Sequence, residues 1–129
     1  MGTFSHQITV LSADGSRTEN VEALVDTGST YFWLPGPLLS GLGYRPAVTR
    51  KLVMATGEEC ERGLAPVLVQ LNGETLPVLC IFGDETSQPL MGAMVLEAFS
   101  LGVDPVNRRL VPIPALAMAA IRMAQVFNE

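Results

Sequence analysis

One carboxylate in this sequence stands where a buried strand would end in a tight turn. The apolar run Ala23-Leu24-Val25 is followed directly by Asp26-Thr27-Gly28. The run predicts a strand and the glycine predicts a turn, so the end of the strand would hold the Asp26 carboxylate rigidly. A carboxylate held in this way can act as a general acid or base on a bound water. The sequence contains this element once, so a site that needs two such groups would take the second from another copy of the chain, across a two-fold axis.

The elements that would position Asp26 are short strands separated by turn residues, which is typical of an all-β domain. Strands are predicted over 4–11 and 18–25, and a turn at 13–16 joins them into a hairpin that ends on Asp26. The other predicted elements are helical turns at 38–42 and 93–99, strands at 50–56, 61–71 and 76–82, a polar hairpin tip at 55–58, a turn at Asn72-Gly73, and a strand-turn-strand segment over 101–112.

The C-terminal segment has a different pattern. Apolar residues recur at helical spacing between residues 115 and 127, and Arg122, Gln125 and Glu129 lie on the opposite face. This spacing predicts an amphipathic helix. We therefore expect a β domain over residues 1–113 and a helical extension over residues 114–129.

Composition limits the classes of function. With 129 residues and 48% hydrophobic content, the chain predicts one domain with a core of its own. Thirteen acidic residues against eight basic ones give a net charge of -5, which disfavours nucleic acid as a partner. The sequence has no leader-like N-terminus and no apolar run near the roughly 20 residues that span a bilayer, so we expect a soluble, cytoplasmic protein without a transmembrane segment.

The two cysteines are predicted to be free thiols. A hairpin that turns at residues 72–73 places Cys80 opposite Ala65, and Cys60 then lies roughly 16 Å further along the strand. Bridged cysteines have Cα atoms within about 7 Å of each other. The sequence has one histidine, His6, and no CxxC pair, so a Cys/His zinc site is not expected. The acidic clusters at 58–61 and 84–85 are interpreted as solvated loops, and we expect no metal or other cofactor.

Three segments together resemble the retropepsin-like aspartic proteases, in particular the stand-alone bacterial forms related in fold to retroviral proteases. They are residues 23–30, the hairpin near residues 54–61, and Pro89-Leu90-Met91-Gly92 before a short helix, in the order and spacing of the family. The resemblance covers roughly residues 4–113. It implies an all-β half-barrel with a flap hairpin and one short helix before the C-terminal strands, in which the strand and loop around Gly92 cross behind the turn at Asp26.

The resemblance also implies an activity. Members of this family cleave peptide bonds as homodimers, and Asp26 from each subunit would activate a water molecule between them. The Thr27 hydroxyl would bond across the dimer axis, and Gly28 would let the backbone approach the substrate. Ser29 would donate a hydrogen bond to the Asp26 carboxylate, and a flap tip of Ala55, Thr56 and Gly57 would close over a peptide with apolar side chains. Asp26, Thr27 and Gly28 are thus the candidate catalytic residues, and Ser29 and the flap tip the candidate substrate-binding residues.

Two positions depart from the retroviral pattern, and several alternatives stay open. Thr30 and Ala93 stand where an acid and an arginine usually pair to brace the dimer. A non-catalytic dimerisation or peptide-binding module is therefore an alternative, and so is a self-processing protease whose C-terminal helix blocks assembly. Each site assignment also has an alternative. Asp26 can be a carboxylate that only caps its turn, and the tip at residues 55–58 can be an ordinary hairpin. The run at residues 31–34 can belong either to the core or to a substrate pocket.

Overall fold

The strands between residues 4 and 91 build a seven-stranded sheet that closes on itself. The computed structural model describes residues 3–114. Strands follow one another in the order β1-β2-β7-β3-β6-β5-β4, and a second pairing of β1 with β5 closes six of them into a ring, with β4 outside β5. The elements are β1 (Phe4–Leu11), β2 (Thr18–Val25), β3 (Phe32–Pro35), α1 (Gly36–Gly41), β4 (Val48–Val53), β5 (Glu59–Leu71), β6 (Glu74–Gly83), β7 (Leu90–Met91), α2 (Ala93–Ala98), β8 (Leu101–Asp104) and β9 (Arg109–Pro112).

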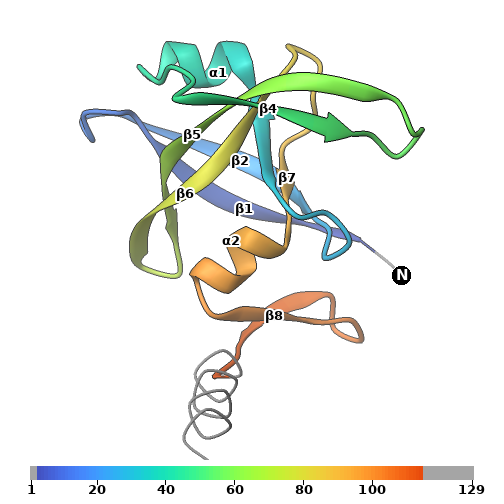
Figure 1. Ribbon diagram of the computed structural model, residues 1–129. Coiled ribbons are helices and arrows are strands. Elements are labelled where there is room, and N and C mark those ends of the chain that lie inside the picture. The colour runs from blue at the N-terminus through green and yellow to red at the C-terminus, as the bar shows by residue number, and fades with distance from the viewer. Residues whose placement is uncertain (1–2, 115–129) are drawn as a thin grey trace, which may run out of the picture.

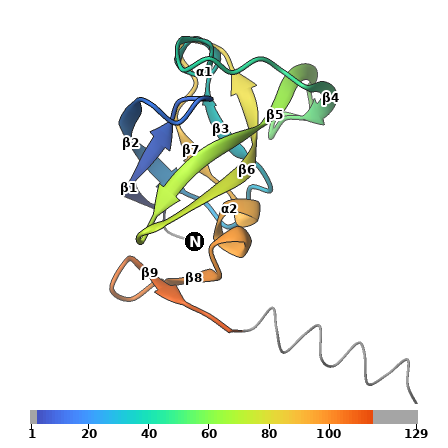
Figure 2. The ribbon, with the colours of Figure 1, turned by 90° about the vertical axis from the view of Figure 1, so that its left-hand side faces the viewer.

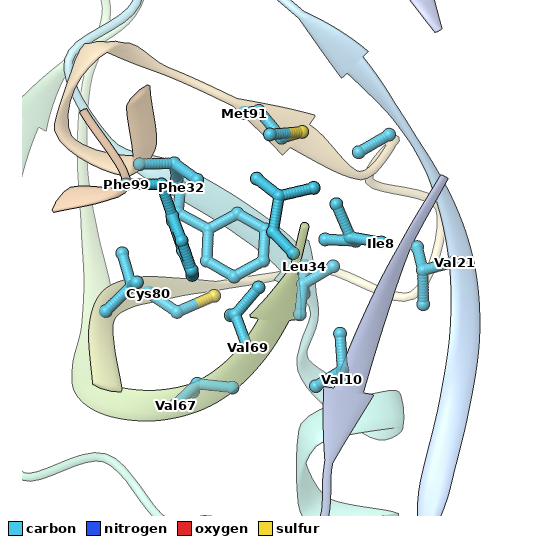
Figure 3. Close-up of a cluster of buried hydrophobic side chains, with 14 of the residues drawn as sticks. Ile8, Val10, Val21, Phe32, Leu34, Val67, Val69, Cys80, Met91 and Phe99 are labelled. Carbon is cyan, nitrogen blue, oxygen red and sulfur yellow. The ribbon is translucent and has the colours of Figure 1, made fainter. Parts of the chain in front are cut away.

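The inward-facing side chains of the ring form the hydrophobic core. Alternate residues of each strand point inward, because successive side chains of a strand lie on opposite faces. In β3, Phe32 and Leu34 are fully buried and Trp33 is not. Phe32 packs among Cys80, Val69 and residues of the neighbouring strands (Figure 3). The core thus fixes β2 and β3, the two strands on either side of Asp26.

The hairpins have the register that the sequence predicts. β1 and β2 occupy the predicted residues, and Ala65 lies opposite Cys80 in the β5–β6 pair. Asn72 and Gly73 have φ values of 52° and 81°, the left-handed conformation that a two-residue hairpin turn requires. Cys60 lies opposite Leu52 on β4, and both thiols are free, as predicted. Burial raises the pKa of the Cys80 thiol well above its usual range.

The remaining elements lie outside the ring. The β4–β5 hairpin projects from it, and its tip overhangs the turn that follows β2 (Figure 1). Helix α2 packs beneath the ring, and the separate β8–β9 hairpin lies on the far side of α2 (Figure 2). Helix α1 begins two residues earlier than predicted, at Gly36, because Pro37 is well accommodated in a first helical turn. The predicted C-terminal helix falls on residues 115–129, outside the described part of the chain.

Candidate active site

Backbone hydrogen bonds hold Asp26 on both sides, and one backbone amide orients its carboxylate. Strand β2 ends at Val25, and the Asp26 amide donates a hydrogen bond of 3.0 Å to the carbonyl oxygen of Met91 in β7. The Asp26 Oδ1 atom accepts a hydrogen bond of 3.0 Å from the Gly28 amide, and the Ser29 amide donates to the Asp26 carbonyl oxygen at 3.2 Å. Asp26 is half-buried. The Asp26 carboxylate therefore caps the turn by accepting from the Gly28 amide, and the same hydrogen bond holds the carboxylate in a fixed direction.

Strand β7 and helix α2 support this turn from behind. β7 lies parallel to β2 and antiparallel to β3, with Leu90 paired with both Leu24 and Trp33. The amides of Ala93 and Met94, at the start of α2, donate to the carbonyl oxygens of Ser29 at 2.7 Å and Thr30 at 3.0 Å. The segment around Gly92 thus packs against the turn as the sequence predicts.

Gly92 is required at the crossing of these two segments. A Cβ atom at this position would lie 2.5 Å from the carbonyl oxygens of Ser29 and Tyr31. Real Cβ atoms do not approach backbone oxygen this closely, so any side chain would push the turn away from α2. Gly28 has a milder constraint, since its Cβ would lie 3.3 Å from Asp26 Oδ1.

We expect Gly92→Ala to destabilise the fold by at least about 2 kcal/mol, because the methyl group overpacks a backbone contact that cannot relax cheaply. The measurement is the free energy of unfolding from urea denaturation. Gly41→Ala is the matched control, because a Cβ there meets nothing within 4 Å. An unchanged midpoint for Gly92→Ala would contradict the close packing of β7 and α2 on the Asp26 turn.

A cleft of about 660 Å³ opens in front of Asp26. Part of its lining comes from the β4 end of the projecting hairpin, and another part from the segment before β7. Of the described residues that line it, Asp26 is the one that carries a charge. The lining consists of Asp26, Gly28, Ser29, Thr30, Tyr31, Trp33, Leu52, Val53, Met54, Ala55, Ser87, Gln88 and Leu90.

A second hollow lies elsewhere on the ring. It measures about 280 Å³, and polar residues of β1, β2 and the β5–β6 turn line it, His6 among them. No carboxylate is among its lining residues. The larger cleft is therefore the candidate active site.

Most of the residues proposed from the sequence meet at this cleft. Asp26, Gly28, Ser29 and Ala55 line it, and Thr27 lies exposed within the same turn. Thr56 and Gly57 are exposed at the hairpin tip and are not among the lining residues. There the Glu58 amide donates to Thr56 Oγ1 at 3.4 Å, and Gly57 has a φ of 87°.

The structure resolves one alternative and adds residues that the sequence analysis missed. Phe32 and Leu34 belong to the core, whereas Tyr31 and Trp33 line the cleft, so the aromatic run serves both roles. The two-residue period of a strand would have separated them. No signal in the sequence marked Ser87 and Gln88. The pairing of distant strands brings their loop to the cleft, and a local sequence pattern does not show such pairing. The lining residues that were not named as site residues from the sequence are Thr30, Leu52, Val53, Met54, Ser87, Gln88 and Leu90; of these, Thr30, Met54 and Leu90 belong to the segments that carry the resemblance.

Two further features are absent from the described residues 3–114. No three side chains of His, Cys, Asp or Glu gather there into a group that could hold a metal ion. No helix in that range is long and apolar enough to cross a membrane.

Comparison with known proteins places the fold. No family profile matches the sequence, and no curated protein sequence matches it. Among solved structures, the solution structure of Simian Foamy Virus (mac) protease matches with a TM-score of 0.53. The two chains are 14% identical, and the match covers 73% of this chain and 92% of the viral one. The chain therefore has a mostly-β, retropepsin-like fold, as the resemblance implied.

Proposed function

We propose that this protein is an aspartic endopeptidase that acts as a homodimer, with Asp26 contributed by each subunit. The observation that supports the proposal best is the Asp26 carboxylate, which the Gly28 amide orients at the floor of a cleft overhung by a hairpin. The fold in which this site occurs is similar to that of a viral protease. Asp26 has no second carboxylate beside it among the lining residues of its own cleft, so the pair requires a second copy.

The proposed mechanism uses the two carboxylates in different protonation states. One ionised Asp26 takes a proton from a bound water, and the protonated Asp26 of the other subunit donates to the carbonyl oxygen of the scissile bond. Two carboxylates at close range do not both ionise, so the pair holds one proton between them, as is general for aspartic proteases. Within this scheme Thr27 joins the two turns across the axis, and Ser29 supports the ionised carboxylate.

The cleft suits an extended peptide with apolar side chains. Tyr31, Trp33, Leu52 and Leu90 offer apolar surface beside a single charged group. An acidic substrate side chain would lose its hydration there without gaining a positively charged partner. In the hairpin over the cleft, β4 ends at Val53, which is 72% exposed, and the next residue, Met54, is 37% exposed. We assign this hairpin, with its tip at residues 55–57, as a flap whose exposed apolar side chains close onto the peptide.

One observation favours a second candidate, a dimerisation or peptide-binding module without catalysis. Thr30 and Ala93 supply no ion pair to brace two subunits, and the Ala93 amide bonds to Ser29 within the same chain. Binding of a peptide without cleavage would identify this alternative. The stand-alone bacterial form, the domain limits at 1–113 and 114–129, the cytoplasmic location and the inhibitory role of the tail remain predictions from the sequence.

We expect kcat/KM to follow a bell-shaped curve with its maximum on the acid side of neutral pH. A pair with both carboxylates protonated lacks a base, and a pair with both ionised lacks an acid. The measurement is cleavage of a denatured mixed-peptide library between about pH 3 and about pH 9. A rate that stays level into the alkaline range would exclude the shared-proton mechanism.

The protein has to stay folded over the acid half of this range. Hydrogen bonds hold the pKa values of three turn carboxyls below their usual range, with the largest contribution from Ser16 for Asp14, Thr86 for Asp84 and Asn107 for Asp104. A group whose pKa is lowered by folding stabilises the fold above its unfolded pKa of about 4, and this contribution is lost as the pH falls through the folded pKa. Circular dichroism at each pH separates a loss of folding from a loss of catalysis.

A further inference from the structure

The loop between β6 and β7 forms a wall of the cleft that holds Asp26. Its residues Ser87 and Gln88 line the cleft together with Asp26 and Trp33. The loop runs from Asp84 to Pro89, and all of its residues are exposed or half-buried, so no hydrophobic packing of its own holds it. Its position therefore depends on hydrogen bonds. The Leu24 amide of β2 donates to the Pro89 carbonyl oxygen at 2.9 Å, and the rest of the loop is held by hydrogen bonds within it.

One carboxylate collects these hydrogen bonds. Asp84 Oδ1 accepts from the Thr86 amide at 3.1 Å, from Thr86 Oγ1 at 2.9 Å and from Ser87 Oγ at 3.1 Å. The Ser87 amide also donates to the Asp84 carbonyl oxygen at 3.1 Å. Hydrogen bonds to an ionised carboxylate are stronger than those between neutral groups, so Asp84 is the main organiser of this loop.

The end of β6 leaves space for the loop to fold back. A Cβ atom at Gly83 would collide with the Ser87 side chain, and it would lie 3.3 Å from the Leu34 carbonyl oxygen. The loop therefore turns back tightly over the backbone of β6. Ser87 is fixed between this glycine on one side and the Asp84 carboxylate on the other.

We propose that Asp84 is a positioning residue for substrate binding, which holds Ser87 and Gln88 in the wall of the cleft. This inference rests on the proposed function. Asp84 itself is not among the cleft-lining residues, so it acts through Ser87 and does not touch the peptide. It is expected to affect KM and to leave the chemical step at Asp26 nearly unchanged.

The chain contains a matched control for this residue. Asp14, in the β1–β2 turn, accepts through Oδ1 from Ser12 Oγ at 2.7 Å, from the Ser16 amide at 3.0 Å and from Ser16 Oγ at 2.7 Å. The two carboxylates thus organise their turns with the same kinds of hydrogen bond. No residue of the Asp14 turn lines the cleft, so only the Asp84 turn can affect binding.

The first experiment measures kcat and KM of the full chain on a quenched fluorogenic peptide with Leu and Phe at its centre. Asp84→Ala is expected to raise KM by about tenfold with kcat within about twofold, because the hydroxyl and amide donors of the loop lose their shared acceptor. Asp84→Asn keeps an oxygen acceptor and is expected to restore most of the affinity. Asp14→Ala should leave KM unchanged. Equal KM values for Asp84→Ala and Asp14→Ala would overturn the proposal.

The second experiment needs no catalysis. Trp33 is the only tryptophan of the sequence, and it lines the same cleft as Ser87 and Gln88. Acrylamide quenching of its fluorescence is expected to rise by about twofold in Asp84→Ala and to stay unchanged in Asp14→Ala, because a loosened wall exposes the indole. Equal quenching in both variants would overturn the proposal.

The two experiments separate this inference from the proposed function. A wild-type chain that cleaves no peptide refutes the endopeptidase, while the quenching still shows whether Asp84 orders the cleft wall. If Asp84→Ala does not fold, Ser87→Ala removes one hydrogen bond of the same set. Ser87→Ala should raise both KM and the acrylamide quenching of Trp33. If neither of them changes, the proposal is overturned.

Discussion

Asp26→Asn is expected to lower kcat/KM on an apolar peptide by at least about a thousandfold, the loss expected when a group that transfers the proton is removed. The asparagine side chain has nearly the size of aspartate, and its carbonyl oxygen can still accept the hydrogen bond from the Gly28 amide. The turn should therefore keep its shape. An amide cannot take a proton from water near neutral pH, so the chemical step should fail while the fold remains.

The measurement compares initial rates of wild type, Asp26→Asn and Asp14→Asn at the pH optimum. Asp14→Asn is the matched control, because it changes the same functional group in a turn that does not line the cleft. Urea denaturation should give Asp26→Asn nearly the stability of wild type. A pepstatin-like inhibitor, whose hydroxyl replaces the water, should block the wild type. Full activity in Asp26→Asn would refute the role of Asp26, and an inactive wild type that still binds peptide would favour the non-catalytic module.

The strands around the site were predictable because local rules and tertiary packing agree there. The β1–β2 hairpin and the Asn72-Gly73 turn follow from alternating apolar residues and from residues suited to tight turns. Gly92 was also predictable as part of a motif, although its physical reason appears only in three dimensions. The carbonyl oxygens of Ser29 and Tyr31 lie where its side chain would be.

The part of the cleft formed by the loop before β7 was not predictable from local patterns. Ser87 and Gln88 belong to a polar loop, and the sequence does not reveal that β7 lies between β2 and β3 and so brings this loop to Asp26. The same holds for Leu90, whose partners Leu24 and Trp33 are far from it in the sequence. Pairing between strands that are distant in the sequence assembles this part of the site. A local pattern predicts that a segment is a strand, but it does not predict which strands pair with it.

The second large effect is expected when two kinds of subunit are mixed. If each site needs Asp26 from both chains, a dimer of one wild-type chain and one Asp26→Asn chain should be inactive. In an equal mixture with random pairing, only about a quarter of the dimers are wild type on both sides. At concentrations above the dissociation constant of the dimer, activity should therefore fall to about half of that given by the same amount of wild type alone, and further addition of the variant should lower it further.

This experiment is possible because the subunit contact is expected to be weak. Without an acid at position 30 and an arginine at position 93, no ion pair of that kind braces the two turns. The subunits should then exchange readily, and activity per subunit of wild type should rise with concentration in the micromolar range, in line with a dimer that forms only in part. Analytical ultracentrifugation over the same range measures the association directly.

Mixing wild type with Asp14→Asn provides the matched control, since both partners then carry an intact Asp26. The activity of this mixture should equal the sum of the activities of the two proteins. The concentration of wild-type chain is the same in every sample, because dilution alone changes the fraction of dimer. If Asp26→Asn chains fail to lower the activity of wild type, and ultracentrifugation shows a monomer that still cleaves, then one chain holds a complete site. The second proton-transfer group would then have to come from the same chain, and a site shared between two copies of Asp26 would be wrong.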